Sequence, residues 1–325
     1  MAAAGPSIEI GLNAAIVAVE AQQPLILVIR SSDSGEPESL PFGPFDPLKH
    51  RTFETGLRAW VAEQTALKLG YVEQLYTFGD RGRHARPGDT GPHLVSVGYL
   101  ALTRPVAEAA RALAEAGAHW RRWYDYFPWE DWRDGRPVLL DEAIMPALHR
   151  WARAPEDAET GRQRRERLRL AFGEGGMPWD EERVLDRYEL LYSAGLVAES
   201  WRDGRYSREK DGDPILFGVP MRFDHRRILA TAVSRLRGKL KYRPVVFELM
   251  PPEFTLTELQ RTVEAISGRH LHKQNFRRLV ENTALVEPTG KQSQPERGRP
   301  AELFRFRREV LKERPSSGLR VGSRA

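Results

Sequence analysis

Four stretches within the first 104 residues have the short apolar runs and β-branched residues that are typical of β-strands. They are residues 13–19, 24–30, 72–78 and 94–102. A further segment, 53–69, places apolar side chains mostly three or four residues apart and is predicted to be a helix. The order strand, strand, helix, strand, strand predicts an α/β sandwich.

The pattern changes to helical spacing between about residue 105 and residue 222. The predicted helices are residues 105–118, 139–153, 160–172 and 180–194, each bounded by glycine or proline. Residues 202–214 are polar and are predicted to form a loop or linker. We therefore expect a helical extension between the sandwich and the rest of the chain.

Seven aromatic residues are concentrated in one short segment of this extension. Such a cluster could stack on an adenine ring or pack one subdomain against another, and packing is the favoured interpretation because large aromatics dominate ordinary cores. The seven are Trp120, Trp123, Tyr124, Tyr126, Phe127, Trp129 and Trp132.

A third region begins near Asp224 with a predicted helix over 224–242. After a short apolar stretch, Thr255 and Glu258 form a capping box, in which each side chain satisfies a backbone N–H of the other residue. The helix that this box opens is predicted to end at Gly268.

A further helix over 272–282 and two short apolar segments follow. Three helices and a two-stranded hairpin predict a winged helix-turn-helix, so the expected fold class is α+β. The predicted regions are 1–104, 105–222 and 223–312, with a disordered tail over 313–325.

The helix over 272–282 has two chemically different faces. Phe276, Leu279 and Val280 share one stripe and are expected to face the core. The outer face carries side chains of the types that bind DNA in the major groove, because Asn and Gln can pair with adenine edges and Arg with guanine or phosphate. These residues are Lys273, Gln274, Asn275, Arg277 and Arg278. The alternative is a basic helix that only faces solvent.

The loop over 289–300 combines two glycines with Lys291, Arg297 and Arg299. A cationic loop between two strands can lie along a phosphate backbone or enter a narrow minor groove. No third ligand accompanies His270 and His272, so no metal site is expected there.

Charge supports a polyanionic partner for the third region. Residues 226–325 contain 22 Lys or Arg and 10 Asp or Glu, whereas the rest of the chain contains 28 and 35. A merely soluble basic surface is the alternative. The absence of cysteine excludes disulfide scaffolds, thiolate metal sites and cysteine nucleophiles. No signal peptide or membrane-spanning run is evident, so a soluble cytoplasmic protein is expected.

Residues 40–66 invite comparison with the Nudix box, G-x5-E-x7-R-E-U-x-E-E-x-G-U, whose glutamates hold Mg²⁺ against a diphosphate. When Arg58 is aligned with the motif arginine, Ala59 and Ala62 stand where glutamates are required, and only Glu63 remains. A single carboxylate cannot chelate the metal, so a Nudix fold without hydrolysis is expected.

The chain resembles the Nudix-related transcriptional regulators of NAD metabolism, of the NrtR and NadQ type, and is closer to the NadQ side. The matching stretches include YVEQLYTFGDRGR, HLVSVGYLAL, FPWEDWRDGRP, GRPAELFRFR and the long segment from RLRGKLKYRPVVFELM to LVEPTG. The resemblance implies a homodimeric repressor of NAD biosynthesis or salvage genes. Its Nudix-like domain would bind a nucleotide effector such as NAD, ADP-ribose or ATP, and its winged helix a palindromic operator. No cofactor is required.

The effector site is assigned to the box helix and the loop after the third strand, because cations on a glycine-rich loop can meet phosphates. An ordinary solvated loop, with Arg58 in a structural hydrogen bond, is the alternative. The assigned residues are Arg58, Glu63, Arg81, Arg83 and Arg86. Two alternatives for the whole chain stay open: an active Nudix hydrolase of ADP-ribose or NAD, and a winged helix that contacts protein.

Overall fold

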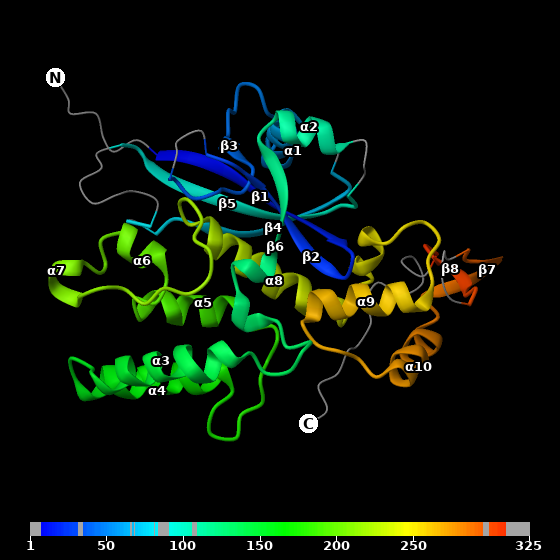
Figure 1. The fold of residues 1–325 in the computed structure, drawn as a ribbon. Coiled ribbons are helices and arrows are strands. Elements are labelled where there is room, and N and C mark those ends of the chain that lie inside the picture. Colours follow the sequence, from blue (N-terminus) through cyan, green and yellow to red (C-terminus); the bar gives the residue numbers. More distant parts are fainter. Residues whose placement is uncertain are drawn as a thin grey trace.

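A computed structural model describes residues 8–31, 35–65, 67, 69–80, 82–83, 91–105, 109–294 and 299–309. Figure 1 shows a twisted sheet with helices on both of its faces and a smaller C-terminal unit at one end. The strands of the large sheet are β1 (Ile8–Glu20), β2 (Gln23–Ile29), β3 (Phe42–Pro44), β4 (Tyr71–Phe78), β5 (His93–Leu102) and β6 (Ala118–Arg122). Their order is β4-β5-β1-β2-β6, with β3 paired to β1.

Strand β1 is the centre of this sheet, and its sequence explains why. It pairs in parallel with β5 and antiparallel with β2 and β3. Leu12 and Ile16 point into one core and Ala15 and Val17 into the other, which is the two-residue alternation of a strand covered on both faces. The apolar run in the sequence therefore corresponds to a strand with no solvent-exposed side.

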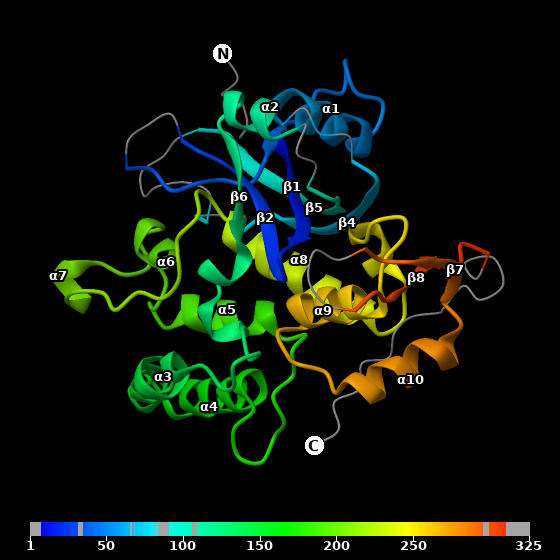
Figure 2. The ribbon, with the colours of Figure 1, turned by 45° about the vertical axis from the view of Figure 1, so that its right-hand side comes forward.

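Helices α1 (Phe53–Thr65) and α2 (Ala110–Glu115) cover one face of the sheet, and α8 (His225–Leu240) crosses the other (Figure 2). All four predicted strands and the helix between them are confirmed. The helix predicted over 105–118 is wrong at its end, because Gly117 adopts a φ of 71° and β6 follows it at the sheet edge. Residues 106–108 lie outside the described residues.

The placement of α8 corrects the predicted third region. Its buried side chains lie nearly all around the helix, which packs between the sheet and α5 (Val184–Ser193). At Gly98 of β5 an added Cβ would lie 3.0 Å from the Ile228 side chain, so glycine permits this close approach. A boundary at residue 222, as predicted, would thus separate α8 from the sheet and α5, against which it packs.

A helical layer follows β6 in the chain, and in Figure 1 its helices α3 (Met145–Arg153) and α4 (Ala158–Phe172) lie below α5 and α8. A π-helical turn opens it, and Pro146 explains that turn because proline has no N–H to donate to the carbonyl four residues earlier. The elements are the π-turn Leu140–Ile144, α3 (Met145–Arg153), α4 (Ala158–Phe172), α5, α6 (Ala198–Arg202) and α7 (Arg208–Asp211).

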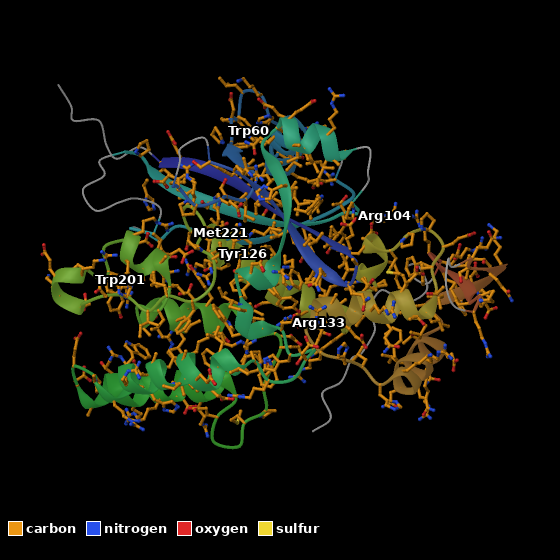
Figure 3. All side chains as sticks on the ribbon, viewed as in Figure 1. Trp60, Arg104, Tyr126, Arg133, Trp201 and Met221 are labelled. Carbon is orange, nitrogen blue, oxygen red and sulfur yellow. The ribbon has the colours of Figure 1, made fainter. Side chains whose placement is uncertain are left out.

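The aromatic segment packs in the interior, as the favoured interpretation predicted. Trp123, Tyr126, Phe127 and Trp129 are at most 1% exposed, so their faces are closed to an adenine ring. Figure 3 places Tyr126 beside Met221, between the sheet and the helical layer. There the buried Arg226 donates to the Tyr126 carbonyl at 2.6 Å and pairs with Glu199, which also accepts from the Met221 N–H.

The C-terminal unit contains the 3₁₀ turn Val245–Leu249, α9 (Leu256–Ser267), α10 (Lys273–Thr283) and the hairpin β7 (Val286–Gln292) and β8 (Glu302–Phe306). The predicted capping box at Thr255 and Glu258 is confirmed. The Phe254 and Phe304 backbones exchange hydrogen bonds of 2.9 and 2.8 Å, which attach β8 to the segment before α9.

A buried carboxylate joins this unit to the rest of the molecule. Glu130 binds Arg187 of α5 through hydrogen bonds of 2.5 and 2.9 Å and Arg237 of α8 at 2.7 Å. Arg237 also donates to the Ile266 carbonyl in α9 at 2.9 Å. These three charged side chains are at most 2% exposed. Beside them, the Trp132 N–H donates to the Gly268 carbonyl at the end of α9.

Glu130→Gln should therefore be strongly destabilising. The change leaves two buried guanidinium groups without their counter-charge, a loss of about 3–5 kcal/mol in the free energy of unfolding. Urea unfolding followed by tryptophan fluorescence measures it, and Glu156→Gln, at an exposed position, is the control. An unchanged unfolding midpoint in Glu130→Gln would contradict this role.

Candidate nucleic-acid interface

Helix α10 presents the two faces that its sequence predicts. Phe276 and Val280 are buried against the domain core, and Leu279 is half-buried beside them. Ala284 ends the helix in the left-handed conformation, with a φ of 49°, and its carbonyl accepts a hydrogen bond from Arg307. The apolar stripe therefore fixes which side of α10 faces outward.

The five predicted DNA-contacting side chains of α10 all lie on its exposed face. Within the described part of the chain, none of them forms an ion pair or a side-chain hydrogen bond. They are Lys273, Gln274, Asn275, Arg277 and Arg278. A helix with three unpaired cations, two amides and no carboxylate among the residues of its first two turns can bind both phosphates and base edges.

The hairpin that follows has the position of a wing beside α10 (Figure 2). Lys291 is exposed but is paired with Glu253 at 2.8 Å, whereas Arg299 is exposed near the start of β8. Arg297 lies outside the described residues. Of the three predicted wing contacts, Lys291 would therefore have to leave its carboxylate partner to bind a phosphate.

The winged-helix unit itself carries much less net positive charge than the C-terminal third of the chain. Residues 246–306 contain nine Lys or Arg and eight Asp or Glu. Seven basic residues of the third region instead lie within 226–243, and Arg226, Arg227 and Arg237 there are committed to internal carboxylates. The basic excess of the third region therefore does not by itself mark a DNA-binding face.

The box helix α1 places its predicted effector residues differently. Arg58 donates to the Leu69 carbonyl at 2.6 Å and the Gly70 carbonyl at 3.2 Å, and pairs with Glu54. These contacts fix the chain where it leaves the box, which is the structural alternative for Arg58. Glu63 is exposed on the same helix. Within the described residues, no three His, Cys, Asp or Glu side chains are placed to hold a metal ion.

Arg83, in the loop after β4, lies in a charged cluster on α5 and α8. It binds Glu189 through two hydrogen bonds of 2.9 and 2.7 Å and lies 3.8 Å over the Tyr192 ring. Burial lowers the pKa of the Arg83 guanidinium, but Glu189 and Asp224 together outweigh burial and the pKa is raised. Burial raises the pKa of the neighbouring Asp224 carboxyl to about 7, although Arg83 and Arg227 oppose the shift.

This geometry leaves Arg83 available to an anion only if the anion replaces a carboxylate. Arg81 and Arg86, the other two arginines assigned to the effector, lie outside the described residues. Arg58 and Glu63 lie on α1, on the other face of the sheet from Glu189 of α5. The described residues of the assigned set are thus not gathered into one site.

Sequence reasoning missed the buried ion pairs, although a signal was present. Arg226 and Arg237 fall on the apolar stripe of α8, in line with Leu229 and Val233. A cation at a position that helical spacing assigns to the core requires a buried partner. Its partner cannot be identified from spacing, because Glu130 and Glu199 are far away in the chain.

Comparisons with known proteins agree with this architecture. Residues 246–306 match the family model of the NrtR DNA-binding winged helix domain. A segment of 88 residues is 45% identical to the "ADPR responsive transcriptional repressor NtrR" of Acinetobacter baylyi (strain ATCC 33305 / BD413 / ADP1). That segment is 27% of this chain and 35% of the repressor, so the match spans about a third of the relative.

Two solved structures share the fold. Shewanella oneidensis NrtR complexed with a 27mer DNA superimposes with a TM-score of 0.55 and 21% identity, covering 93% of this chain and 95% of that one. Shewanella oneidensis NrtR gives a TM-score of 0.53 and 22% identity, covering 92% and 94%. The expected resemblance to NrtR-type, Nudix-related regulators is confirmed, and the family match leaves α8 outside the winged helix.

Arg277→Ala should weaken sequence-specific DNA binding by about 1–3 kcal/mol, because a guanidinium on the outer face of α10 can bind a base edge or a phosphate. Fluorescence anisotropy with a bound duplex measures the change. Arg51→Ala, an exposed arginine before α1, is the control. Equal affinities for the Arg277→Ala and Arg51→Ala variants would place α10 outside the interface.

Proposed function

We propose that this chain, whose C-terminal unit is an NrtR-type winged helix, is a DNA-binding transcriptional repressor of NAD biosynthesis or salvage genes. The observation that carries the proposal is the outer face of α10, where cations and amides are exposed and unpaired among the described residues. The family match of residues 246–306 to a DNA-binding winged helix supports this role for that face.

The effector is a nucleotide, and ADP-ribose is the first candidate because the Acinetobacter relative is named as responsive to ADPR. NAD and ATP remain to be compared with it. The effector-binding residues in this proposal are the loop arginines Arg81, Arg83 and Arg86, because Arg58 and Glu63 lie on α1, across the sheet from the Arg83 cluster. In this proposal, the effector phosphate competes with the Glu189 carboxylate for the Arg83 guanidinium, to which Glu189 is now paired.

The Nudix-like domain binds its ligand without turnover. Ala59 and Ala62 stand at the positions where the Nudix box requires glutamates, and alanine cannot coordinate Mg²⁺. The repressor is a homodimer on a palindromic operator, since two-fold DNA sites match two-fold proteins.

A gel shift with the upstream regions of NAD-synthesis genes tests the function. We expect specific retardation of at least one fragment, and ADP-ribose, NAD or ATP to change it. Retardation that an unlabelled mixed-sequence competitor removes as readily as the fragment itself would contradict specific repression. The hydrolase alternative predicts Mg²⁺-dependent release of AMP from ADP-ribose or NAD, whereas we expect none.

The effector loop can be tested apart from its internal ion pair. Arg81→Gln with Arg86→Gln removes two loop cations and keeps Arg83 on Glu189. We expect this variant to bind DNA normally and to lose its response to the effector, because two phosphate ligands are gone. A gel shift across an effector titration measures it, and a response equal to that of the unmodified chain would exclude both arginines.

A further inference from the structure

The winged helix is nearly neutral for a domain that binds a polyanion. Residues 246–306 contain nine basic and eight acidic residues. Neutralisation of phosphates by Lys and Arg supplies most of the sequence-independent affinity for duplex DNA. Three cations on α10 and those of the wing are few for neutralising DNA phosphates. Further exposed cations on the side of the molecule that carries α10 therefore matter for DNA binding.

Helices α3 and α4 carry such cations. Residues 145–172 contain seven arginines and four acidic residues. Arg162, Arg165 and Arg169 follow one face of α4 at helical spacing, and all three are exposed. Arg150 and Arg153 are exposed on the outer side of α3. We call these five residues the α3–α4 arginine surface.

The two helices that carry this surface lie on the same side of the molecule as α10. In Figures 1 and 2, α3, α4 and α10 all lie along the lower edge, below α5 and α9. The chain that leaves α4 also contacts the turn before α10, because Arg269 donates to the Trp179 carbonyl at 2.9 Å. Trp179 in turn packs against Trp132, with ring centroids 4.4 Å apart.

The helical pair is held firmly in this position. Arg164 of α4 lies over the Trp151 ring of α3 and donates to the Trp151 and Ala154 carbonyls at 3.0 Å. His149 bonds Glu174, the residue after the glycine that ends α4. Exposed arginines on a fixed helical pair lose less conformational freedom on binding than arginines on a loose one.

We propose that the α3–α4 arginine surface is a second DNA contact, which binds the phosphate backbone flanking the bases that α10 reads. This inference rests on the proposed function for the role of α10. It assigns sequence reading to α10 and part of the electrostatic attraction to a helical layer outside the winged helix. Arg162 pairs with Glu159 and Arg169 with Glu166, and their side chains remain 74% and 47% exposed.

The test is the triple variant Arg162→Gln, Arg165→Gln, Arg169→Gln. Its matched control is Lys49→Gln, Arg51→Gln, Arg111→Gln, near α1 and α2 on the opposite side of the molecule. Each set removes three exposed cations, two of which pair with a carboxylate three or four residues away. Circular dichroism and the melting temperature verify folding of both.

Anisotropy titrations at several salt concentrations use the fragment retarded in the gel shift, that fragment trimmed of its flanks, and a mixed-sequence duplex. We expect the triple variant to lower the slope of log affinity against log salt by about 2 to 3, since each lost phosphate contact removes about 0.9. Affinity should fall on the long fragment and on the mixed-sequence duplex, and less on the trimmed one.

A triple variant with the same salt slope as the unmodified chain and the control overturns the inference and leaves the proposed function intact. If the unmodified chain binds every duplex equally, specific repression fails, while the mixed-sequence titration still decides the role of the arginine surface. Binding of no duplex at all overturns both.

Discussion

A carboxylate shared by two arginines, buried where four segments meet, constrains the whole molecule. The buried Glu130 carboxylate has its counter-charges in Arg187 and Arg237, which both bind it. Arg187 fixes α5 and Arg237 fixes α8, and Arg237 also binds the backbone of α9. The winged helix is thus tied to this cluster by a charge-assisted hydrogen bond to its backbone, and sliding α9 along the body would leave the buried Arg237 N–H without its carbonyl acceptor.

The same two helices also reach the candidate effector loop. Glu189, two residues from Arg187 on α5, binds Arg83, and Arg227 at the start of α8 binds Glu189. Helices α5 and α8 therefore contact the loop after β4 through ion pairs, and α8 contacts the winged helix through the hydrogen bond from Arg237 to α9.

Much of this arrangement is predictable from periodicity, and the failures have identifiable causes. The β1 sequence predicts a strand, and the stripe of Phe276 and Val280 fixes the outer face of α10, because both patterns report local burial. The location of α8 was not predictable, since an apolar helix face does not identify the element against which it packs. Strand β6 was missed because its pairing with β2 depends on a distant edge rather than on its own composition. The separation of the described effector residues was not predictable either, because Arg58 and Arg83 bind partners that are distant in the sequence.

Net charge predicts a polyanionic partner for the C-terminal third, but part of the charge that it counts lies inside the body. Basic residues of 226–243 raise the charge of the C-terminal third, but several neutralise carboxylates inside the body, including Glu130, Glu189 and Glu199. Charge that is neutralised internally contributes little field at the surface, whereas exposed cations act on DNA over roughly a Debye length of about 10 Å. An interface is therefore better identified by cations that lack a carboxylate partner and share one side of the fold. In the described residues, the outer face of α10 satisfies that condition fully. On the α3–α4 arginine surface, Arg150, Arg153 and Arg165 satisfy it, whereas Arg162 and Arg169 pair with exposed carboxylates.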